Sequence, residues 1–484
     1  MLKRHLIAGA CLLQVMAWNV PAADHAWVIG GGPYLENSQA QIEFNINWVL
    51  EFLRNSDADR VIHTYFTDGG APFKDVVEWS RPADDPASLQ PLARVFDAVE
   101  ENGNHYRNSR VPGVDGSTSR AELLDELAHG FSALRPGDRA LIVYNGHGLR
   151  GQRDAGDNTL RLWNDTEVTA REFERLLDKV DPAVPIRFLF AQCYSGGFSR
   201  LIHPGGEDVL ELAPGQRCGF MAESEDREAE GCSASVKIGD YRDYTTYFFS
   251  ALSGTDRMGR PVTQDVDLDH DGRITLFDAH LYALAYGYNG DLPRATSETF
   301  LERWQPWYLR WLDTRTVPDN LYGKLSRIVA GRLGLPGTEP ALVRELHARK
   351  RSLQQQMNRA LEEHDANKRR IHELQYGMQR DVGERWPGAL HPYTGNHRQF
   401  MEKYLNEAQA FILAHADYPE LRDRQDRQME LDKVMLKIER DMTQLDKVLR
   451  LRRLARLLDQ FQHHAGKAEK AWFRQLRQCE RSAL

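Results

Sequence analysis

The sequence predicts an α/β fold, a mainly parallel sheet with helices on both faces, followed by a C-terminal all-α domain built as a coiled coil or helical hairpin. Two observations predict it. In the first two thirds of the chain, short apolar segments alternate with amphipathic ones, the pattern of buried parallel strands joined by helices. In the last third, long charged segments carry apolar residues at heptad spacing. Because 41% of the 484 residues are hydrophobic, the chain can bury a large core.

The first 23 residues differ from the rest of the chain. A basic start (residues 3–5) precedes an apolar run, and small residues stand at positions 20 and 22 before a possible cleavage site. This order is typical of a secretory signal peptide. The alternative is an uncleaved anchor, but the run is shorter than the roughly 20 residues that span a bilayer. We therefore expect removal of residues 1–23 from a secreted or periplasmic protein without a stable membrane span. Lipid attachment at Cys11 is not expected, because the usual preceding leucine is missing.

Seven segments of the first part of the chain have the length and pattern of regular elements. Near-continuous apolar runs indicate strands, whereas apolar residues three and four positions apart indicate helices. The last helix opens with Thr169 and Glu172 in capping-box spacing. Parallel strands joined by helices have their carboxyl ends at one edge of the sheet, where such folds bind ligands. The expected strands are residues 25–31, 60–68, 139–148 and 186–192, and the expected helices are 39–54, 119–134 and 169–180.

A domain boundary is expected in the glycine- and proline-containing segment 331–340. From residue 340 onward the chain has 28 Lys and Arg against 21 Asp and Glu, whereas the preceding residues have 34 against 49. We assign residues 24–335 to the sheet domain and residues 336–484 to the helical extension. Self-association of the extension and docking on the oppositely charged first domain are both compatible with this division.

Two stretches of the extension repeat apolar residues in alternating steps of three and four. Such spacing is typical of paired helices, and the polar His364 and Asn367 within the seam would fix the register of the pair or tune the choice of partner. The seam positions are Leu353, Met357, Ala360, His364, Asn367, Ile371, Leu374 and Met378 in the first stretch, and Leu431, Met435, Ile438, Met442, Leu445 and Leu449 in the second.

Two expected strands end at residues that carry chemistry. "ALIVYNGHG" ends at His147, and "IRFLFAQC" ends at Cys193. Because one helical crossover joins these strands, we expect the imidazole and the thiol to meet at one edge of the sheet. An imidazole can favour the thiolate of a nucleophilic cysteine and protonate a leaving amine. The backbone N–H groups of Gly148 and Cys193 would form an oxyanion hole, since glycine allows close approach of a substrate carbonyl.

This pair of motifs resembles the caspase-like cysteine peptidases, the clan of caspases, metacaspases and legumains. The shared signature is an apolar strand ending in His147-Gly148 and a second ending in Cys193, 46 residues later. The resemblance spans roughly residues 25–290. It implies a caspase-like fold and an endopeptidase that cleaves proteins or peptides through a Cys-His dyad and an acyl-enzyme. No organic cofactor and no nucleic acid are expected.

The chain departs from these families around the expected substrate pocket. Caspases carry Gln-Ala-Cys, but here the order is Ala-Gln192-Cys. Legumains carry an arginine in the first loop, where the nearest polar residue here is Asn37. Asp68 and Glu223, at expected strand ends, could bind a basic side chain or be solvated carboxylates. These four residues are the pocket candidates, and the preferred residue at the cleaved bond stays open.

A second motif, "DLDHDGRITLFD" at residues 267–278, resembles a calcium-binding loop. Alternating oxygen ligands and a glycine for the tight turn are what such a loop requires. An Asp-rich turn without metal is the alternative reading. Calcium here is expected to have a structural or gating role. The expected ligands are Asp267, Asp269, Asp271, the carbonyl of Arg273, and Asp278, which replaces the usual bidentate glutamate.

Four cysteines follow the expected signal peptide, and a compartment outside the cytoplasm favours pairing among them. Cys218 and Cys232 bracket a short acidic segment, so we expect a disulfide between them. That pairing leaves Cys193 free to act as the nucleophile.

Two alternatives to peptide hydrolysis accompany this reading. The same acyl-enzyme can be captured by an amine, which would make the protein a ligase or transpeptidase. Alternatively, the protein is a calcium-responsive coiled-coil scaffold whose peptidase-like domain is inactive.

Overall fold

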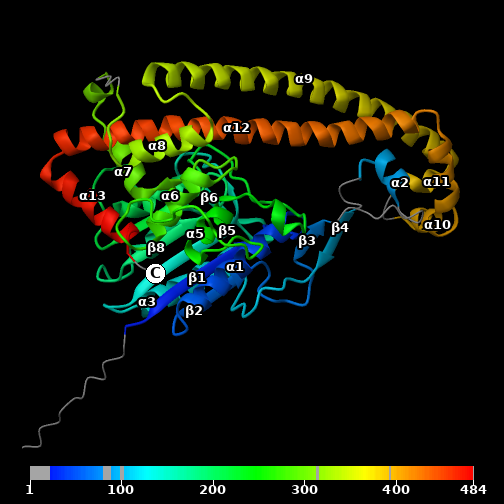
Figure 1. Cartoon of the computed structure of the whole chain (residues 1–484). Helices are drawn as coiled ribbons and strands as arrows, with labels where there is room; N and C mark the ends of the chain where they lie inside the picture. The colour runs from blue at the N-terminus through cyan, green and yellow to red at the C-terminus, as the bar shows by residue number, and fades with distance from the viewer. Residues whose placement is uncertain (1–21, 80–88, 99–102, 312–315, 392–393, 483–484) are drawn as a thin grey trace, which may run out of the picture.

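A computed structural model describes residues 22–79, 89–98, 103–311, 316–391 and 394–482 (Figure 1). Residues 1–21 of the expected signal peptide lie outside the described part. Among the described helices, none is both long enough and apolar enough to cross a bilayer.

A mainly parallel sheet forms the centre of the first domain, as the apolar runs predict. Its strand order is β10–β9–β8–β5–β1–β2, and every neighbouring pair is parallel except β9 and β10. A short antiparallel pair, β6 and β7, extends from β5. The strands are β1 (Asp24–Gly31), β2 (Val61–Phe66), β5 (Arg139–Leu149), β6 (Thr159–Leu162), β7 (Thr166–Thr169), β8 (Ile186–Phe190), β9 (Arg217–Met221) and β10 (Arg294–Ala295).

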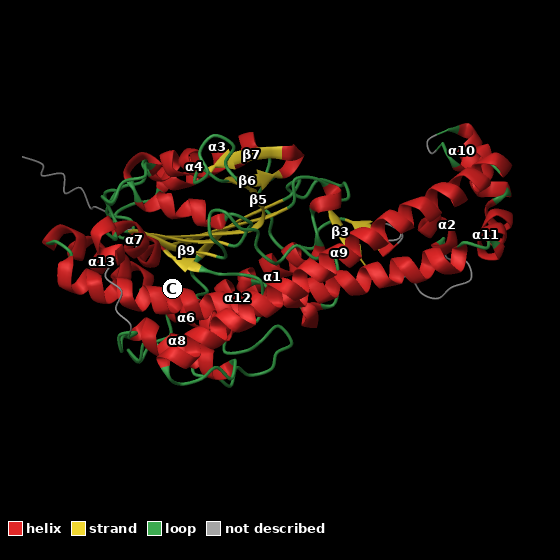
Figure 2. Ribbon diagram, turned by 90° about the horizontal axis from the view of Figure 1, so that it is seen from above, coloured by secondary structure: helices red, strands yellow, loops and turns green. Residues whose placement is uncertain are grey.

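Helices cover both faces of this sheet. Figure 2 shows α3 and α4 on one side and α1 and α6 on the other. At the start of α4 the Thr169 side chain accepts from the Glu172 N–H, and the Glu172 side chain accepts from Thr169, so the predicted capping box is confirmed. The helices of this domain are α1 (Ala40–Ser56), α3 (Arg120–Ala133), α4 (Ala170–Leu177), α5 (Tyr244–Ser253), α6 (Leu276–Tyr286), α7 (Thr296–Trp304) and α8 (Leu321–Arg332).

Several shorter elements were not expected from the sequence. An antiparallel pair, β3 (Val76–Trp79) and β4 (Asn104–Arg107), is inserted after β2, and the helix α2 (Gln90–Val95) lies between the two strands in the sequence. Short 3-10 helices complete the chain: η1 (Leu35–Asn37), η3 (Trp163–Asp165), η4 (Ser195–Ile202), η5 (Pro204–Gly206), η6 (Ile238–Asp240), η7 (Trp307–Trp311) and η8 (Pro387–Ala389).

The C-terminal extension is a long helical hairpin. Its arms are α9 (Glu339–Arg385) and α12 (Tyr418–His464), each of 47 residues and therefore about 70 Å long. In the seam, Asn367 Nδ2 donates to the Arg424 carbonyl at 2.7 Å, so this polar residue links the two arms of the hairpin. The remaining helices are α10 (Gly395–Lys403) and α11 (Leu405–Ala414) at the far end, and α13 (Lys467–Glu480), which returns to the sheet.

The C-terminal half of α12, together with α13, packs against the sheet domain. Leu451 and Leu454 of α12 and Leu476 of α13 are fully buried and belong to the same apolar core as the strands. Helix α12 packs on α7 and α8, and α13 packs on β9. The two sequence patterns on either side of residue 335 therefore share one core.

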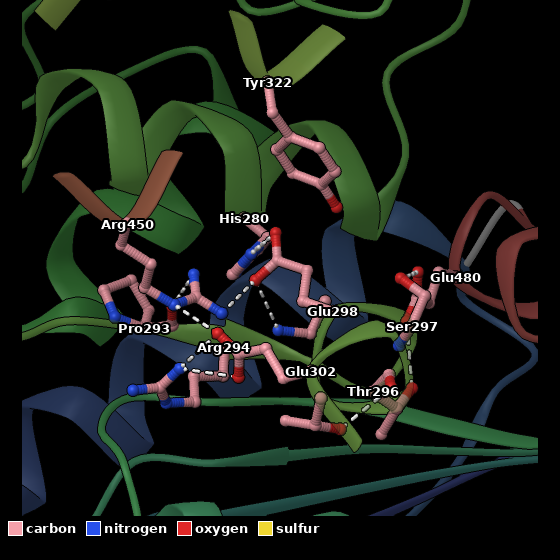
Figure 3. Close-up of polar contacts among 12 residues, drawn as sticks. His280, Pro293, Arg294, Thr296, Ser297, Glu298, Glu302, Tyr322, Arg450 and Glu480 are labelled. Atoms are coloured by element: carbon pink, nitrogen blue, oxygen red, sulfur yellow. Dashed lines mark hydrogen bonds and ion pairs between the residues drawn. The ribbon is translucent and has the colours of Figure 1, made fainter. Parts of the chain in front are cut away.

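A buried polar network joins the hairpin to the first domain (Figure 3). Arg450 of α12 donates to Glu298 Oε2 of α7 at 2.9 Å, and His280 Nε2 of α6 lies 3.2 Å from Glu298 Oε1. Glu480 of α13 accepts from the N–H and hydroxyl of Ser297 at 2.7 and 2.6 Å. Burial alone would raise the pKa of Glu298, but Arg450 and His280 hold it well below its usual range. The interface therefore contains a paired and hydrogen-bonded carboxylate.

The expected disulfide between Cys218 and Cys232 is wrong. Cys218 pairs with Cys479 of α13, with their Cα atoms 6.0 Å apart, and Cys193 and Cys232 are free. Cys218 stands near the amino end of β9, whereas Cys232 lies beyond the carboxyl end of that strand. Each strand residue advances the chain by about 3.3 Å, so a short separation in sequence does not bring these two thiols together.

The far end of the hairpin holds the inserted helix α2. Figure 1 shows α2 beside α10 and α11. The buried Val95 packs into an apolar cluster with residues of α9 and α11, and Gln375 and Gln379 donate to the carbonyls of Arg94 and Val95 at 2.9 and 2.8 Å. The hairpin thus contacts the sheet domain at one end, and at the other end it contacts the segment with α2 that is inserted in the sheet domain.

Candidate active site

The two predicted strand ends lie next to each other. Strands β5 and β8 are parallel, and their last paired residues are Tyr144 and Phe190. Three residues further along, the first segment reaches His147 and the second reaches Cys193. Gly148 is packed so closely that a β-carbon there would lie 2.4 Å from the Cys193 carbonyl oxygen. Only glycine fits at position 148. This contact places the segments that carry His147 and Cys193 against each other at the carboxyl edge of the sheet.

The His147 ring is held by oxygen atoms on one side. Its Nε2 lies 2.8 Å from the Asn37 carbonyl oxygen and 2.9 Å from Gln39 Oε1. A carbonyl oxygen can only accept, so Nε2 carries the hydrogen and neutral His147 has its lone pair on Nδ1. Asn37 therefore contacts the site through its backbone, from η1. Gln39, just before α1, was missed because no sequence pattern distinguishes it from other polar residues of that loop.

Cys193 is half-buried, and its thiol donates to the Ala229 carbonyl oxygen at 3.7 Å. Burial raises the pKa of this thiol to about 11. Burial lowers the pKa of His147, and Arg161 lowers it further against the opposing effect of the Asn37 carbonyl. At neutral pH the pair is therefore an uncharged thiol and an uncharged imidazole.

The chain turns sharply after Cys193. Tyr194 has a left-handed backbone with φ of 58°, and η4 begins at the next residue. The Tyr194 N–H donates to the Arg227 carbonyl at 2.8 Å, and a β-carbon at Gly196 would lie 2.5 Å from the Glu225 nitrogen. The "CYSGG" turn is thereby packed against the loop that follows β9.

A second thiol, which the sequence reading assigned to a disulfide, lies at the histidine. Cys232 Sγ is 3.7 Å from His147 Nδ1, the nitrogen that carries the lone pair. The loop that follows β9 thus contacts both members of the expected dyad, Cys193 through the Ala229 carbonyl and His147 through Cys232.

Two of the four expected pocket residues, Gln192 and Glu223, are buried but differ in their hydrogen bonding. Gln192 is 1% exposed beside Cys193, and neither polar atom of its amide has a hydrogen-bond partner within the described part of the chain. Glu223 is fully buried and accepts from the Ser224 and Leu292 N–H groups at 3.0 and 2.8 Å, so it joins β9 to a neighbouring loop.

Asp68 stands further from the dyad, because β2 is two strands away from β5. It accepts from the Gly70 N–H at 3.1 Å in its own turn, and burial raises its pKa. Of the four candidates, Asn37 and Gln192 contact the segments that carry the dyad.

The acidic loop before α6 has its first three carboxylates together. Each of Asp267, Asp269 and Asp271 offers an oxygen within 4.8 Å of the others. The Gly272 N–H donates to Asp267 Oδ2 at 3.0 Å, and Gly272 has φ of 83°, which suits the tight turn expected there. The three carboxylates are close enough together to share one cation, and each also accepts from a backbone N–H group of the turn.

The fourth carboxylate, Asp278, is not gathered into this group. Its Oδ2 accepts from the Thr275 N–H at 3.0 Å as the cap of α6, and its Oδ1 is buried with no hydrogen-bond partner among the described residues. The guanidinium of Arg481, at the end of α13, lies 2.8 Å from Asp269 Oδ2. A positive group of the chain itself therefore neutralises part of the acidic loop.

Comparisons with known proteins add little to this geometry. No protein-family model matches the sequence, and no curated protein matches it. The crystal structure of protein GSU0716 from Geobacter sulfurreducens is similar over 56% of this chain and 92% of its own, with 12% sequence identity and a TM-score of 0.33. A likeness at that level carries no functional argument.

Proposed function

We propose that the protein is a cysteine endopeptidase of the caspase and legumain type. The observation that carries the proposal is the tautomer of His147: its Nε2 hydrogen is bound by the Asn37 carbonyl, which leaves the lone pair on Nδ1, and the segment that carries His147 packs against the one that carries Cys193. A basic nitrogen held next to a thiol is the arrangement that activates a cysteine nucleophile.

In the proposed reaction Cys193 Sγ attacks the carbonyl carbon of the peptide bond while its proton passes to His147 Nδ1. The N–H groups of Gly148 and Cys193 would hold the oxyanion. His147 then returns the proton to the leaving amine, and an acyl-enzyme forms. Water, deprotonated by His147, hydrolyses the acyl-enzyme and restores the thiol. The Gln39 side chain would help to keep the imidazole in the required tautomer.

Calcium and export belong to the same proposal. Asp267, Asp269 and Asp271 would supply oxygen ligands of the kind that calcium prefers, and the buried Oδ1 of Asp278, at the start of α6, has no hydrogen-bond partner among the described residues. Residues 1–23 would direct the chain to the periplasm or the exterior. The Cys218–Cys479 disulfide supports an oxidising compartment.

An electrophilic peptide probe tests the proposal. The purified protein, with and without calcium, should be labelled covalently at Cys193, and labelling should disappear in Cys193→Ala and fall at least tenfold in His147→Ala. Cys232→Ser serves as the matched control for the loss of a thiol near the same histidine, and it should still be labelled.

The alternatives give different results in this experiment. Labelling at Cys193 together with transfer of the acyl group to an added amine, rather than to water, would favour a ligase. Absence of labelling both with and without calcium would contradict the proposed peptidase activity and favour the scaffold.

A further inference from the structure

Two free cysteines lie at the candidate site, and the sulfur of one of them contacts the imidazole. Cys193 bonds to the Ala229 carbonyl oxygen, and Cys232, three residues after Ala229, places its sulfur 3.7 Å from His147 Nδ1. The stretch 229–232 therefore contacts the nucleophile at one end and the base at the other. A peptidase of this type requires one thiol at the histidine, so the second thiol needs its own explanation.

The chain holds Cys232 in this position from both sides. On the amino side, the Glu230 N–H donates to Asp291 Oδ1 at 2.6 Å, and the Glu230 carboxylate forms an ion pair with Arg440 of α12. On the carboxyl side, Ser233 exchanges two hydrogen bonds with Gln41, of 3.0 and 3.1 Å. The residues on either side are anchored, so the thiol is presented to the dyad.

The two thiols also differ in their access to solvent. Cys232 is exposed, whereas Cys193 is half-buried. Burial raises the pKa of the Cys232 thiol well above its usual value, so its reaction with a small oxidant needs His147 Nδ1, 3.7 Å from the sulfur, to remove the proton.

We propose that Cys232 is a redox modification site whose oxidation by a small-molecule disulfide forms a reversible Cys193–Cys232 bond and removes the nucleophile. The inactivation rests on the proposed peptidase function, but the formation of the bond does not.

The chemistry proceeds by two thiol–disulfide exchanges. The Cys232 thiolate attacks oxidised glutathione, forming a mixed disulfide and releasing one glutathione thiolate, which takes up the proton that Cys232 lost. The Cys193 thiolate then attacks the Cys232 sulfur, and the second glutathione leaves as a thiol. Two protein thiols are oxidised to a disulfide, and one oxidised glutathione is reduced to two glutathione molecules. Excess reduced glutathione reverses both steps.

The test treats the full-length protein with oxidised glutathione and maps its disulfides by peptide mass spectrometry under non-reducing conditions. The wild type is expected to give a Cys193–Cys232 crosslink, to lose at least tenfold of its reactivity with an electrophilic probe at Cys193, and to regain it with reduced glutathione. Cys232→Ser should retain its probe reactivity under the same treatment. Cys193→Ser should stop at a mixed disulfide on Cys232.

A matched control keeps the number of thiols but moves one of them. The double variant Cys232→Ser with Ser233→Cys moves the thiol to a residue whose backbone is held by Gln41, and it should form no crosslink to Cys193. Equal crosslinking by this control, or a wild type that yields only mixed disulfides, would overturn the proposal.

The crosslink is scored independently of peptide cleavage, so the two proposals can fail separately. A crosslink in a protein that labels with no electrophilic peptide would leave the redox site standing and reject the peptidase. A labelled peptidase without the crosslink would reject the redox site alone.

Discussion

At the scale of single residues, the proton distribution of the dyad is set by burial and by one carbonyl group. The Asn37 carbonyl fixes the tautomer of His147, and burial keeps both His147 and Cys193 uncharged at neutral pH. The pair therefore differs from a thiolate–imidazolium pair, in which the sulfur is charged before a substrate arrives. The distinction can be measured, because alkylating agents react with the thiolate.

The alkylation rate of Cys193 should follow its raised pKa. A thiol with a pKa of about 11 is ionised in roughly one molecule in ten thousand at pH 7. In a Cys232→Ser background, the rate with iodoacetamide is expected to rise about tenfold per pH unit from pH 7 to pH 10, since thiolate increases until the pH reaches the pKa. A plateau already near pH 6 would show a preformed thiolate and contradict this description.

At the scale of elements, the acidic loop before α6 and the end of α13 are joined by a charge contact. Asp269 is 1% exposed in its side chain, and Arg481 Nη2 lies 2.8 Å from it. A calcium ion that takes Asp269 as a ligand has to compete with this guanidinium. The end of α13 would therefore affect any calcium affinity of a loop some two hundred residues earlier in the sequence.

Removal of Arg481 should strengthen calcium binding. Ion pairs that are partly exposed are worth about 1 kcal/mol or less, so Arg481→Gln is expected to lower the calcium Kd by roughly three- to fivefold in titration calorimetry. Lys470→Gln, which removes the same charge elsewhere on α13, is the control and should leave the affinity nearly unchanged. Equal affinities of wild type and Arg481→Gln would show that the contact does not compete, and no binding by any form would reject calcium.

At the scale of the whole molecule, the hairpin and the sheet are joined by apolar packing, polar contacts and a covalent bond. They share an apolar core, the buried network around Glu298 and Arg450, and the Cys218–Cys479 disulfide. The disulfide spans 261 residues of sequence, so it restricts the unfolded chain strongly. Helix α12 also reaches the candidate site, because its Arg440 pairs with Glu230 in the loop that carries Cys232.

Loss of this disulfide should destabilise the entire protein in a single transition. The double variant Cys218→Ala with Cys479→Ala is expected to lose about 2–5 kcal/mol of unfolding free energy in urea denaturation. Cys193→Ala, at a thiol outside any disulfide, is the control and should change it by less than about 1 kcal/mol. If the double variant unfolds at the wild-type urea concentration, the bond does not constrain the fold. If the hairpin unfolds before the sheet, the shared core is not cooperative.

Much of the fold was predictable because several elements have a clear signal within their own short stretch of sequence. The apolar runs at β1, β2, β5 and β8 are long enough to be read directly, and the Thr169 capping box marks the start of α4. The strands β3, β4, β6 and β7 have only four residues each, too few to establish a pattern. Their formation depends on pairing with other strands, β3 with β4 and β6 with β5 and β7, and not on a pattern within each segment.

The sequence by itself determined four central strands and three helices of the first domain and the delivery of His147 and Cys193 to one edge of a parallel sheet, because apolar periodicity and crossover handedness suffice for both. Only the tertiary structure decided the thiol pairing and the partners of each charge. Cys218 meets Cys479, Cys232 meets His147, and Arg481 meets Asp269. These contacts depend on distances across the folded chain, which separation along the sequence does not give.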